Sequence, residues 1–433
     1  MNLTWVSIVR LGVIQMAIGA IVVLMTSTLN RLMIVELALP AVLPGCLVAL
    51  HYGIQITRPN WGFRSDTGGR RTPWVIGGMA ILGAGAFMAA MAIPVLETQL
   101  TLGLFISVVA YALIGLGVGA SGTSLLALLA TATAPRRRAA AATITWLMMI
   151  AGIAVTAGVT GAMLDPYSHA LLLKIVGAVV VIAFILTVAA IFGIEQQATE
   201  TTETTETTET DHMSFTDGIK EIWAERAARR FSIFVFLSMT AYFMQELILE
   251  PYAGLVFGFT PGASTSLSGA QNGGVFFGMI SVGILCTGLN IGSLRSWVVA
   301  GCVGSAISLT VIAALGLGGS AMQLSIAVVS LGFFNGMFAV GAIGSMMSLA
   351  GEGRNDREGT RVGIWGAAQA IAAGFGGLLG ASMVDLLRMV LTEDAAAYGT
   401  VFLFEAALFI ASSTLALRIM STQAVSVRLV PGE

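Results

Sequence analysis

Long apolar segments separated by short polar ones follow one another from Leu11 almost to Met420. An α-helix rises 1.5 Å per residue, so about 20 apolar residues cross the roughly 30 Å hydrocarbon core of a bilayer. Twelve segments reach about that length, and each predicts a membrane-spanning helix. Their approximate bounds are 11–29, 37–57, 73–95, 100–130, 140–163, 170–193, 231–255, 268–288, 296–317, 322–349, 364–388 and 399–420.

The composition agrees with this pattern. Of the 433 residues, 56% are hydrophobic and only 10% are charged, and the mean hydropathy is +0.90. An ordinary soluble domain carries about a quarter charged residues. The sequence therefore predicts an integral, all-α membrane protein.

The distribution of basic residues predicts the orientation of the chain. When the chain is threaded through the twelve segments, the 21 Lys and Arg fall on one side of the membrane, except Arg31, Lys174 and Arg388. Cytoplasmic loops carry the excess of positive charge in membrane proteins, so both termini are expected in the cytoplasm. Because these bases serve as topology signals, no nucleic-acid partner is expected.

A polar tract divides the chain into halves. Residues 195–211, EQQATETTETTETTETD, repeat Glu-Thr-Thr and have nothing to bury, which predicts a disordered cytoplasmic linker. The stretch that follows has an apolar stripe and a basic face, typical of a helix lying on the inner leaflet. We therefore predict an N-terminal six-helix bundle over 1–194, a linker over 195–230, and a C-terminal six-helix bundle with a short tail over 231–433. Two such halves around a central site are typical of a transporter fold.

The loop after the second expected span supports the same fold. Its sequence, GFRSDTGGRR, has the spacing of the G-x-x-x-D-x-x-G-R-R/K signature of the major facilitator superfamily, with Thr67 where a basic residue is usual. The matching residues are Gly62, Asp66, Gly69, Arg70 and Arg71. Glycine permits a tight turn, the Asp can meet the N-terminus of a neighbouring helix, and the arginines can pair with acids or with lipid headgroups. A solvated basic loop is the alternative interpretation.

Glycines recur at four-residue spacing inside the expected spans and predict close helix packing without chemistry. These pairs are Gly115 and Gly119, Gly274 and Gly278, Gly332 and Gly336, and Gly376 and Gly380.

Two polar clusters interrupt the apolar segments. A charge at the bilayer centre costs roughly 2.5–3.5 kcal/mol on insertion scales, so intramembrane charges indicate function more often than surface charges do. The first cluster, at the outer end of the first span, consists of Asn30, Arg31 and Glu36. The second cluster, inside the seventh span, consists of Gln245, Glu246 and Glu250. If the halves are repeats, these spans correspond, and the clusters are expected to face each other across the central axis.

Each cluster has a second interpretation. Arg31 and Glu36 would then form an exterior ion pair that only anchors a helix end, and Glu246 and Glu250 would relay protons. Three single charges stand apart from both clusters, namely Asp385, Arg388 and Glu405.

Several longer stretches resemble one known family in the expected order along nearly the whole chain. They are STLNRLMIVELALPAVLPGCLVALHY (27–52), RSDTGGRRTPWVIGG (64–78), ITWLMMIAGI (144–153), MQELILEPYAG (244–254) and IWGAAQAIAAGFGGLLGA (364–381). With these stretches the sequence resembles the PucC (LhaA) family, the bacteriochlorophyll delivery family of the major facilitator superfamily. Its length and short C-terminal tail resemble the branch associated with bacteriochlorophyll synthase. The resemblance implies a facilitator-type fold in the inner or intracytoplasmic photosynthetic membrane of a phototrophic bacterium.

The resemblance also implies a function. We predict a non-catalytic assembly factor or carrier that binds or delivers bacteriochlorophyll during light-harvesting complex assembly, with membrane lipids around it. The expected partners are light-harvesting antenna polypeptides and bacteriochlorophyll synthase. Catalysis is not expected, because prenyl transfer needs clustered aspartates that hold magnesium diphosphate, and the acid-rich loop 351–358 has the wrong spacing. The alternative is a proton-coupled, facilitator-type transporter of a small amphipathic solute.

The predicted pigment or partner site combines both clusters with two further side chains. A pigment needs a mostly apolar groove with a few fixed polar groups, so Arg31 is expected to donate to a ring carbonyl while Glu36 holds it. His51 is the only histidine inside an expected span. A neutral imidazole binds the magnesium of a chlorophyll axially, or else only bonds a neighbouring hydroxyl or carbonyl. The candidates are Asn30, Arg31, Glu36, His51, Gln245, Glu246, Glu250 and Tyr252.

Overall fold

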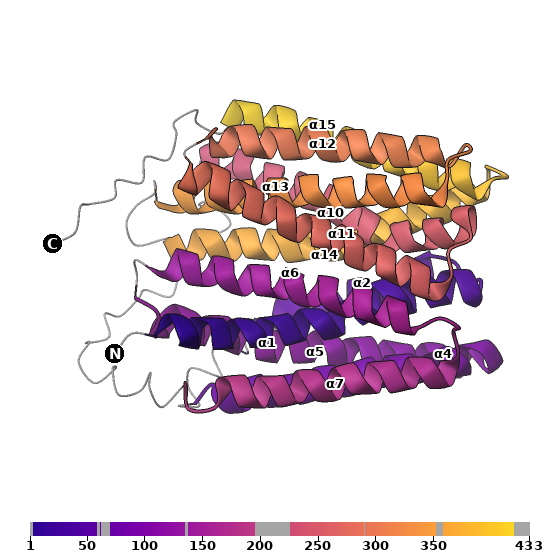
Figure 1. The fold of residues 1–433 in the computed structure, drawn as a ribbon, viewed down its shortest axis with the longest axis horizontal. Coiled ribbons are helices and arrows are strands. Elements are labelled where there is room, and N and C mark those ends of the chain that lie inside the picture. Colours follow the sequence, from indigo (N-terminus) through magenta and orange to yellow (C-terminus); the bar gives the residue numbers. More distant parts are fainter. Residues whose placement is uncertain are drawn as a thin grey trace.

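A computed structural model describes residues 3–58, 61, 70–134, 137–194, 226–289, 291–351 and 358–419. The described residues form helices that run side by side along one direction, with no strand among them (Figure 1). Eleven of these helices are long and apolar enough to cross a membrane, and a shorter apolar helix covers Val42–Thr57. The all-α, multi-pass membrane fold is therefore confirmed.

The first half of the chain forms one bundle around its own apolar core. Its first helix, α1 (Trp5–Val23), continues through two π-helical segments, and the second expected span is shorter than predicted. The elements are α1, η1 (Leu24–Leu29), η2 (Leu32–Glu36), α2 (Val42–Ile54), η3 (Gln55–Thr57), α4 (Thr72–Thr98), α5 (Leu100–Ala132), α6 (Arg138–Met163) and α7 (His169–Ile191).

The second half forms another bundle with a separate core. Its elements are α10 (Arg226–Phe257), α11 (Pro261–Val282), η6 (Gly283–Gly288), α12 (Leu294–Leu315), α13 (Ala321–Gly351), α14 (Glu358–Arg388) and α15 (Asp394–Ile419). Helix α11 begins well before the predicted residue 268. Its first turns carry Ser264 and Thr265, which are polar yet fully buried between helices, so their polarity does not end the span.

Several predicted segments lie outside the described residues. They include the Glu-Thr-Thr tract, most of the expected surface helix, and Gly62, Asp66 and Gly69 of the loop motif. Arg226, Arg229 and Arg230, the expected basic face of that surface helix, instead begin α10, which runs on into the seventh span. The linker and the domain boundaries stay predictions.

Glycines allow helices to touch through their backbones, as the four-residue spacing predicted. A Cβ atom on Gly278 of α11 would collide with the carbonyl oxygen of Phe333 on α13. In return, a Cβ atom on Gly336 of α13 would collide with the carbonyl oxygen of Val275 on α11. Small residues at such positions let dispersion contacts, rather than a hydrophobic force, hold helices together in lipid.

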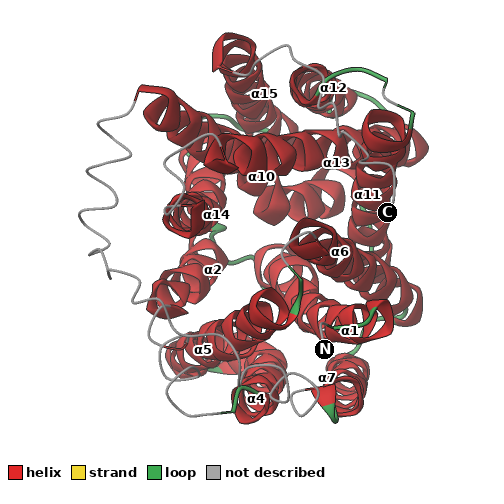
Figure 2. Cartoon of the chain, turned by 90° about the vertical axis from the view of Figure 1, so that its left-hand side faces the viewer, coloured by secondary structure: helices red, strands yellow, loops and turns green. Residues whose placement is uncertain are grey.

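The two bundles meet along two helix pairs that flank the centre. Helix α6 lies against α11, and α2 lies against α14 (Figure 2). The beginning of α1 and the end of α15 lie at the same end of the molecule (Figure 1), which we call the termini end. The loops 37–41, 164–168 and 258–260 connect helices at the opposite end, which we call the far end.

Candidate functional site

The first membrane helix departs from α geometry where the first polar cluster begins. Residues Leu24–Leu29 and Leu32–Glu36 are π-helical, and Ala38, just after them, has a positive φ of 51°. A π turn inserts an extra residue and shifts the following side chains around the helix axis, and such turns are frequent at functional sites. Here the polar side chains of these turns reach the C-terminal bundle.

Three of these side chains bond directly to the C-terminal bundle. The Ser27 hydroxyl donates to the Glu250 carboxylate, and the Asn30 amide donates to the carbonyl oxygen of Leu247 at 2.8 Å. The hydroxyls of Thr28 and Thr265 lie 3.3 Å apart. All of these side chains are buried, so the contacts are shielded from water and tie α1 to α10 and α11.

Arg31 joins the same contact region from a buried position. Its side chain is 2% exposed, whereas that of its ion-pair partner Glu36 is 41% exposed. A second guanidinium nitrogen donates to the carbonyl oxygen of Phe259 at 2.7 Å. Arg31 therefore spans from the N-terminal bundle to the loop after α10, and it is more than an exterior anchor of one helix end.

Two aspartates complete the contacts at the far end. The Asp385 carboxylate on α14 accepts the backbone N–H groups of Ala41 at 3.0 Å and Val42 at 2.7 Å, at the start of α2. Asp165, after α6, accepts the Thr260 hydroxyl at 2.7 Å and the Gly262 N–H at 3.3 Å, at the start of α11. Carboxylates at helix N-termini satisfy unpaired N–H groups and interact favourably with the helix dipole.

We call this set of contacts between the bundles the far-end seal. Its members from the N-terminal bundle are Ser27, Thr28, Asn30, Arg31, Ala41, Val42 and Asp165; those from the C-terminal bundle are Leu247, Glu250, Phe259, Thr260, Gly262, Thr265 and Asp385.

The candidate residues of α10 divide between two faces of the helix. Glu250 faces the N-terminal bundle, where Ser27 bonds to it, and Glu246 lies beside Thr26. Tyr252 instead points into the C-terminal bundle, where its hydroxyl donates to the Ile312 carbonyl at 2.8 Å. Side chains four apart share a helix face, and successive ones are turned by about 100°. Glu250 and Tyr252 are two positions apart, which turns them by about 200°, so they end on opposite sides of α10.

The remaining members of the candidate set lie away from the seal. Gln245 is 2% exposed and lies beside Glu405 of α15, inside the C-terminal bundle. His51 is 1% exposed, and the Gln55 amide donates to its Nε2 at 2.8 Å. The carbonyl oxygen of His51 packs against Gly115 of α5. The structure therefore places Gln245 and His51 within separate bundles.

The single charges also have different surroundings. Arg388 pairs with Asp394 at 2.7 Å within the C-terminal bundle. Glu405 is fully buried beside the backbone of Gln245, and no side chain among the described residues bonds its carboxylate. Only Asp385 takes part in the far-end seal.

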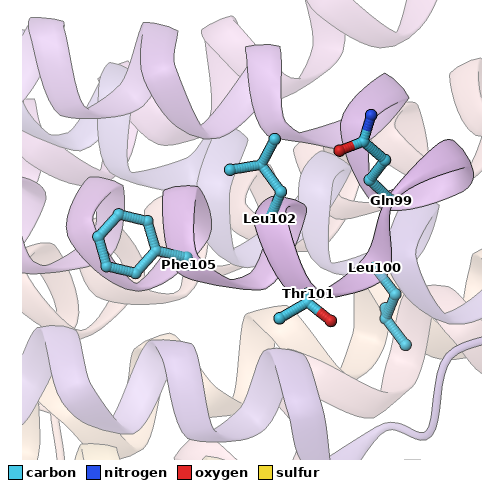
Figure 3. A pocket seen from close by; sticks show the side chains of 5 residues that line it. All are labelled: Gln99, Leu100, Thr101, Leu102 and Phe105. Carbon is cyan, nitrogen blue, oxygen red and sulfur yellow. The ribbon is translucent and has the colours of Figure 1, made fainter.

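An open surface pocket lies apart from all these residues. Figure 3 shows its lining at the beginning of α5, formed by Gln99, Leu100, Thr101, Leu102 and Phe105. The side chains are mostly apolar, come from one short segment and carry no ionisable group, so we assign this pocket no role.

Two bundles of membrane helices with polar groups at their interface define a facilitator-type transporter fold. The crystal structure of a mutant of the nucleoside transporter NupG matches with a TM-score of 0.69 and 14% identity, over 96% of this chain and 100% of that one. A mutant of the peptide transporter POT, in complex with alafosfalin, matches with a TM-score of 0.66 and 14% identity, over 96% and 95%. At these identities the likeness shows the fold alone.

Sequence comparison then gives the family. The family described as PUCC protein matches residues 28–424. The "Bacteriochlorophyll synthase 44.5 kDa chain" of Rhodobacter capsulatus is 61% identical over 424 residues, which cover 98% of this chain and 97% of that one. "Protein PucC" of Cereibacter sphaeroides is 29% identical over 410 residues, 90% and 86% of the two chains. The chain belongs to the PUCC protein family, and the resemblance found in the sequence is confirmed.

Proposed function

We propose that this chain is a non-catalytic membrane protein that binds bacteriochlorophyll and passes it on during the assembly of photosynthetic complexes. The observation that carries the proposal is its 61% identity, over nearly the full length of both proteins, to a chain named for bacteriochlorophyll synthase. Its membership of the PUCC family agrees with this role.

The name of that relative also suggests an enzymatic role, and the sequence argues against such a role. Prenyl transfer from a diphosphate needs carboxylates that hold magnesium, and the sequence has no D-x-x-D pair for this purpose. We infer that the chain accompanies the synthase as a partner. Antenna polypeptides are the second proposed partner, since pigment delivered by this chain needs an acceptor.

We divide the candidate residues into two roles according to their contacts. Arg31 already bonds Glu36 and the Phe259 carbonyl, and its side chain is only 2% exposed, so a ring carbonyl cannot reach its remaining N–H groups. We assign Asn30, Arg31, Glu36 and Glu250 to closing the two bundles against each other. Pigment contact is left to partly exposed groups on the same interface, of which Glu246 is one.

The orientation that the basic residues predict places the termini end in the cytoplasm of a phototroph. Pigment would then meet the protein from the cytoplasmic side of the inner or intracytoplasmic membrane, while the far-end seal closes the opposite side. Bacteriochlorophyll is cargo in this proposal and has no catalytic part.

Purification tests the proposal directly. The tagged chain, solubilised from phototrophic membranes in mild detergent, is expected to carry bacteriochlorophyll in its absorption spectrum and to co-purify with synthase or antenna chains. A tagged unrelated facilitator from the same membranes controls for pigment carried over in micelles. The proposal would be overturned if the purified chain carries no pigment and a strain that lacks the chain still assembles normal light-harvesting complexes.

The fold supports a second candidate function, a proton-coupled transporter of a small amphipathic solute. Two carboxyl groups, Glu246 and Glu250, lie where the bundles meet. Proteoliposomes with an imposed pH gradient test this function. Solute accumulation that Glu250→Gln abolishes would favour it over pigment delivery.

A further inference from the structure

One face of α10 carries three ionisable side chains one helical turn apart. Tyr242, Glu246 and Glu250 are spaced by four residues, so they form a stripe on the same face. The stripe faces the N-terminal bundle, because Glu250 bonds Ser27 and Glu246 lies beside Thr26.

Burial divides this stripe at Glu246. Glu250 is 3% exposed and belongs to the far-end seal. Glu246 and Tyr242, the next positions toward the termini end, are partly exposed. A ligand can therefore reach Glu246 without breaking the buried hydrogen bonds of the seal.

Tyr52 of α2 completes the group from the other bundle. It is partly exposed, and Glu246 and Tyr242 are both close enough to interact with it electrostatically. The ring of Phe243 packs edge-on against both tyrosines, with centroids 5.9 Å from Tyr52 and 5.1 Å from Tyr242. A carboxyl group thus lies among two phenols and a third aromatic ring, at the interface of the bundles.

His51, by contrast, cannot present its ring to a ligand at this interface. The ring of the neighbouring Tyr52 packs edge-on against that of His51, with the centroids 4.9 Å apart. The Nε2 atom of His51 already accepts from Gln55, and the Gln55 carbonyl in turn accepts from Arg58. The Nδ1 atom lies in a side chain that is 1% exposed.

We propose that Tyr52, Tyr242 and Glu246 form the pigment-contact site, an inference that rests on the proposed function. In this acid–tyrosine site the Glu246 carboxylate is the oxygen ligand of the pigment's magnesium. Magnesium is a hard cation that prefers oxygen ligands. The two phenol hydroxyls donate to carbonyl groups at the ring edge, and the aromatic side chains pack against the macrocycle. Contact with the metal also offsets the cost of a carboxylate between membrane helices.

Binding of bacteriochlorophyll and of the same pigment with its magnesium removed by acid tests this site. The purified full-length chain in detergent is titrated with each form, and the absorption change gives two dissociation constants. The wild type is expected to prefer the magnesium form. Glu246→Leu is expected to lose that preference, with at least about tenfold weaker binding of the magnesium form only. Tyr242→Phe is expected to weaken both forms equally, by about fivefold, as for one lost hydrogen bond.

Two further variants serve as controls for the magnesium preference. Glu246→Gln retains an oxygen and the side-chain shape, so it is expected to keep part of the preference. His51→Leu is expected to keep all of it. Thermal unfolding of each variant shows whether weaker binding reflects a loss of folding.

Three outcomes would overturn the site. If His51→Leu loses the preference for magnesium while Glu246→Leu keeps it, the ligand is His51. If both variants bind like the wild type, the pigment binds elsewhere and the proposed function stands without this site. If the wild type binds neither pigment form, the proposed function fails together with the site.

Discussion

The two parts of the interface between the bundles differ in how their polar groups are used. In the far-end seal, carboxylates, amides, hydroxyls and a guanidinium from one bundle find partners on the other. In the acid–tyrosine site, polar side chains from the same helices stay partly exposed. Because an unpaired polar group is expensive where water is excluded, paired groups indicate closure, and exposed ones indicate contact with a ligand. Position along α10, rather than chemistry alone, therefore separates the two roles.

The ion pair of Arg31 and Glu36 offers the largest expected effect on the seal. Glu36→Leu leaves the buried Arg31 guanidinium with a single carbonyl partner, and we expect a loss of about 3 kcal/mol, the lower end of the range for a buried charge that loses its partner. Arg31→Leu should cost less, because the remaining Glu36 is 41% exposed and stays hydrated. Thermal unfolding in detergent measures both.

The double variant tests the same ion pair further. Arg31→Leu with Glu36→Leu is expected to be more stable than Glu36→Leu alone, because no uncompensated charge stays buried. A double variant less stable than both single variants would show that the pair contributes net stability. Pigment binding should change less than in Glu246→Leu, since Arg31 belongs to the seal and neither residue belongs to the acid–tyrosine site.

Removal of the α2 cap is the next largest expected effect. Asp385→Ala leaves the N–H groups of Ala41 and Val42 unpaired, and loss of a helix cap costs about 1–2 kcal/mol. Asp394→Ala is the matched control, because Asp394 pairs with Arg388 within one bundle. If the two variants melt at the same temperature, contact between the bundles adds nothing at this position.

Glu405 is buried inside one bundle, whereas Glu250 is buried between the two bundles. Glu250 has the Ser27 hydroxyl as a partner, whereas Glu405 is fully buried and has no side-chain partner among the described residues. Glu405→Leu is therefore expected to raise stability by about 1 kcal/mol, because it removes a desolvated polar group. A melting temperature below that of the wild type would show that the carboxyl group has a partner or a function.

Tyr167, in the loop after α6, gives the smallest expected effect. Burial, together with the nearby Glu36 and Glu97, raises the pKa of Tyr167 to about 12. Its neutral form is favoured by folding, so this contribution is complete below about pH 10 and is lost as the pH rises toward 12. Tyr167→Phe should leave stability at pH 7 within about 0.5 kcal/mol of the wild type and weaken the alkaline decline. Unfolding measured from pH 8 to 11 checks both.

Parts of the fold and of the site were predictable for different reasons. Span positions follow from local apolar runs, because each helix must satisfy its own backbone and cover the hydrocarbon core. The predicted end of the first span is too early, since its residues up to Glu36 stay helical through π turns. For the site, the cost of intramembrane charge pointed to Arg31 and Glu246, whereas Tyr52 and Tyr242, the further residues of the proposed acid–tyrosine site, carry no such signal.

The class, the family and the approximate number of membrane helices follow from the sequence alone, because hydropathy and motifs are properties of short segments. The sequence also required that the charges of α1 and α10 find partners. Which partners they find depends on the tertiary structure. Ser27 and Glu250, or Arg31 and Phe259, are more than 200 residues apart in the chain. They meet because the bundles pack through α6 on α11 and α2 on α14. That packing also divides the stripe on α10 into a closed part and an open one, since burial depends on both halves together.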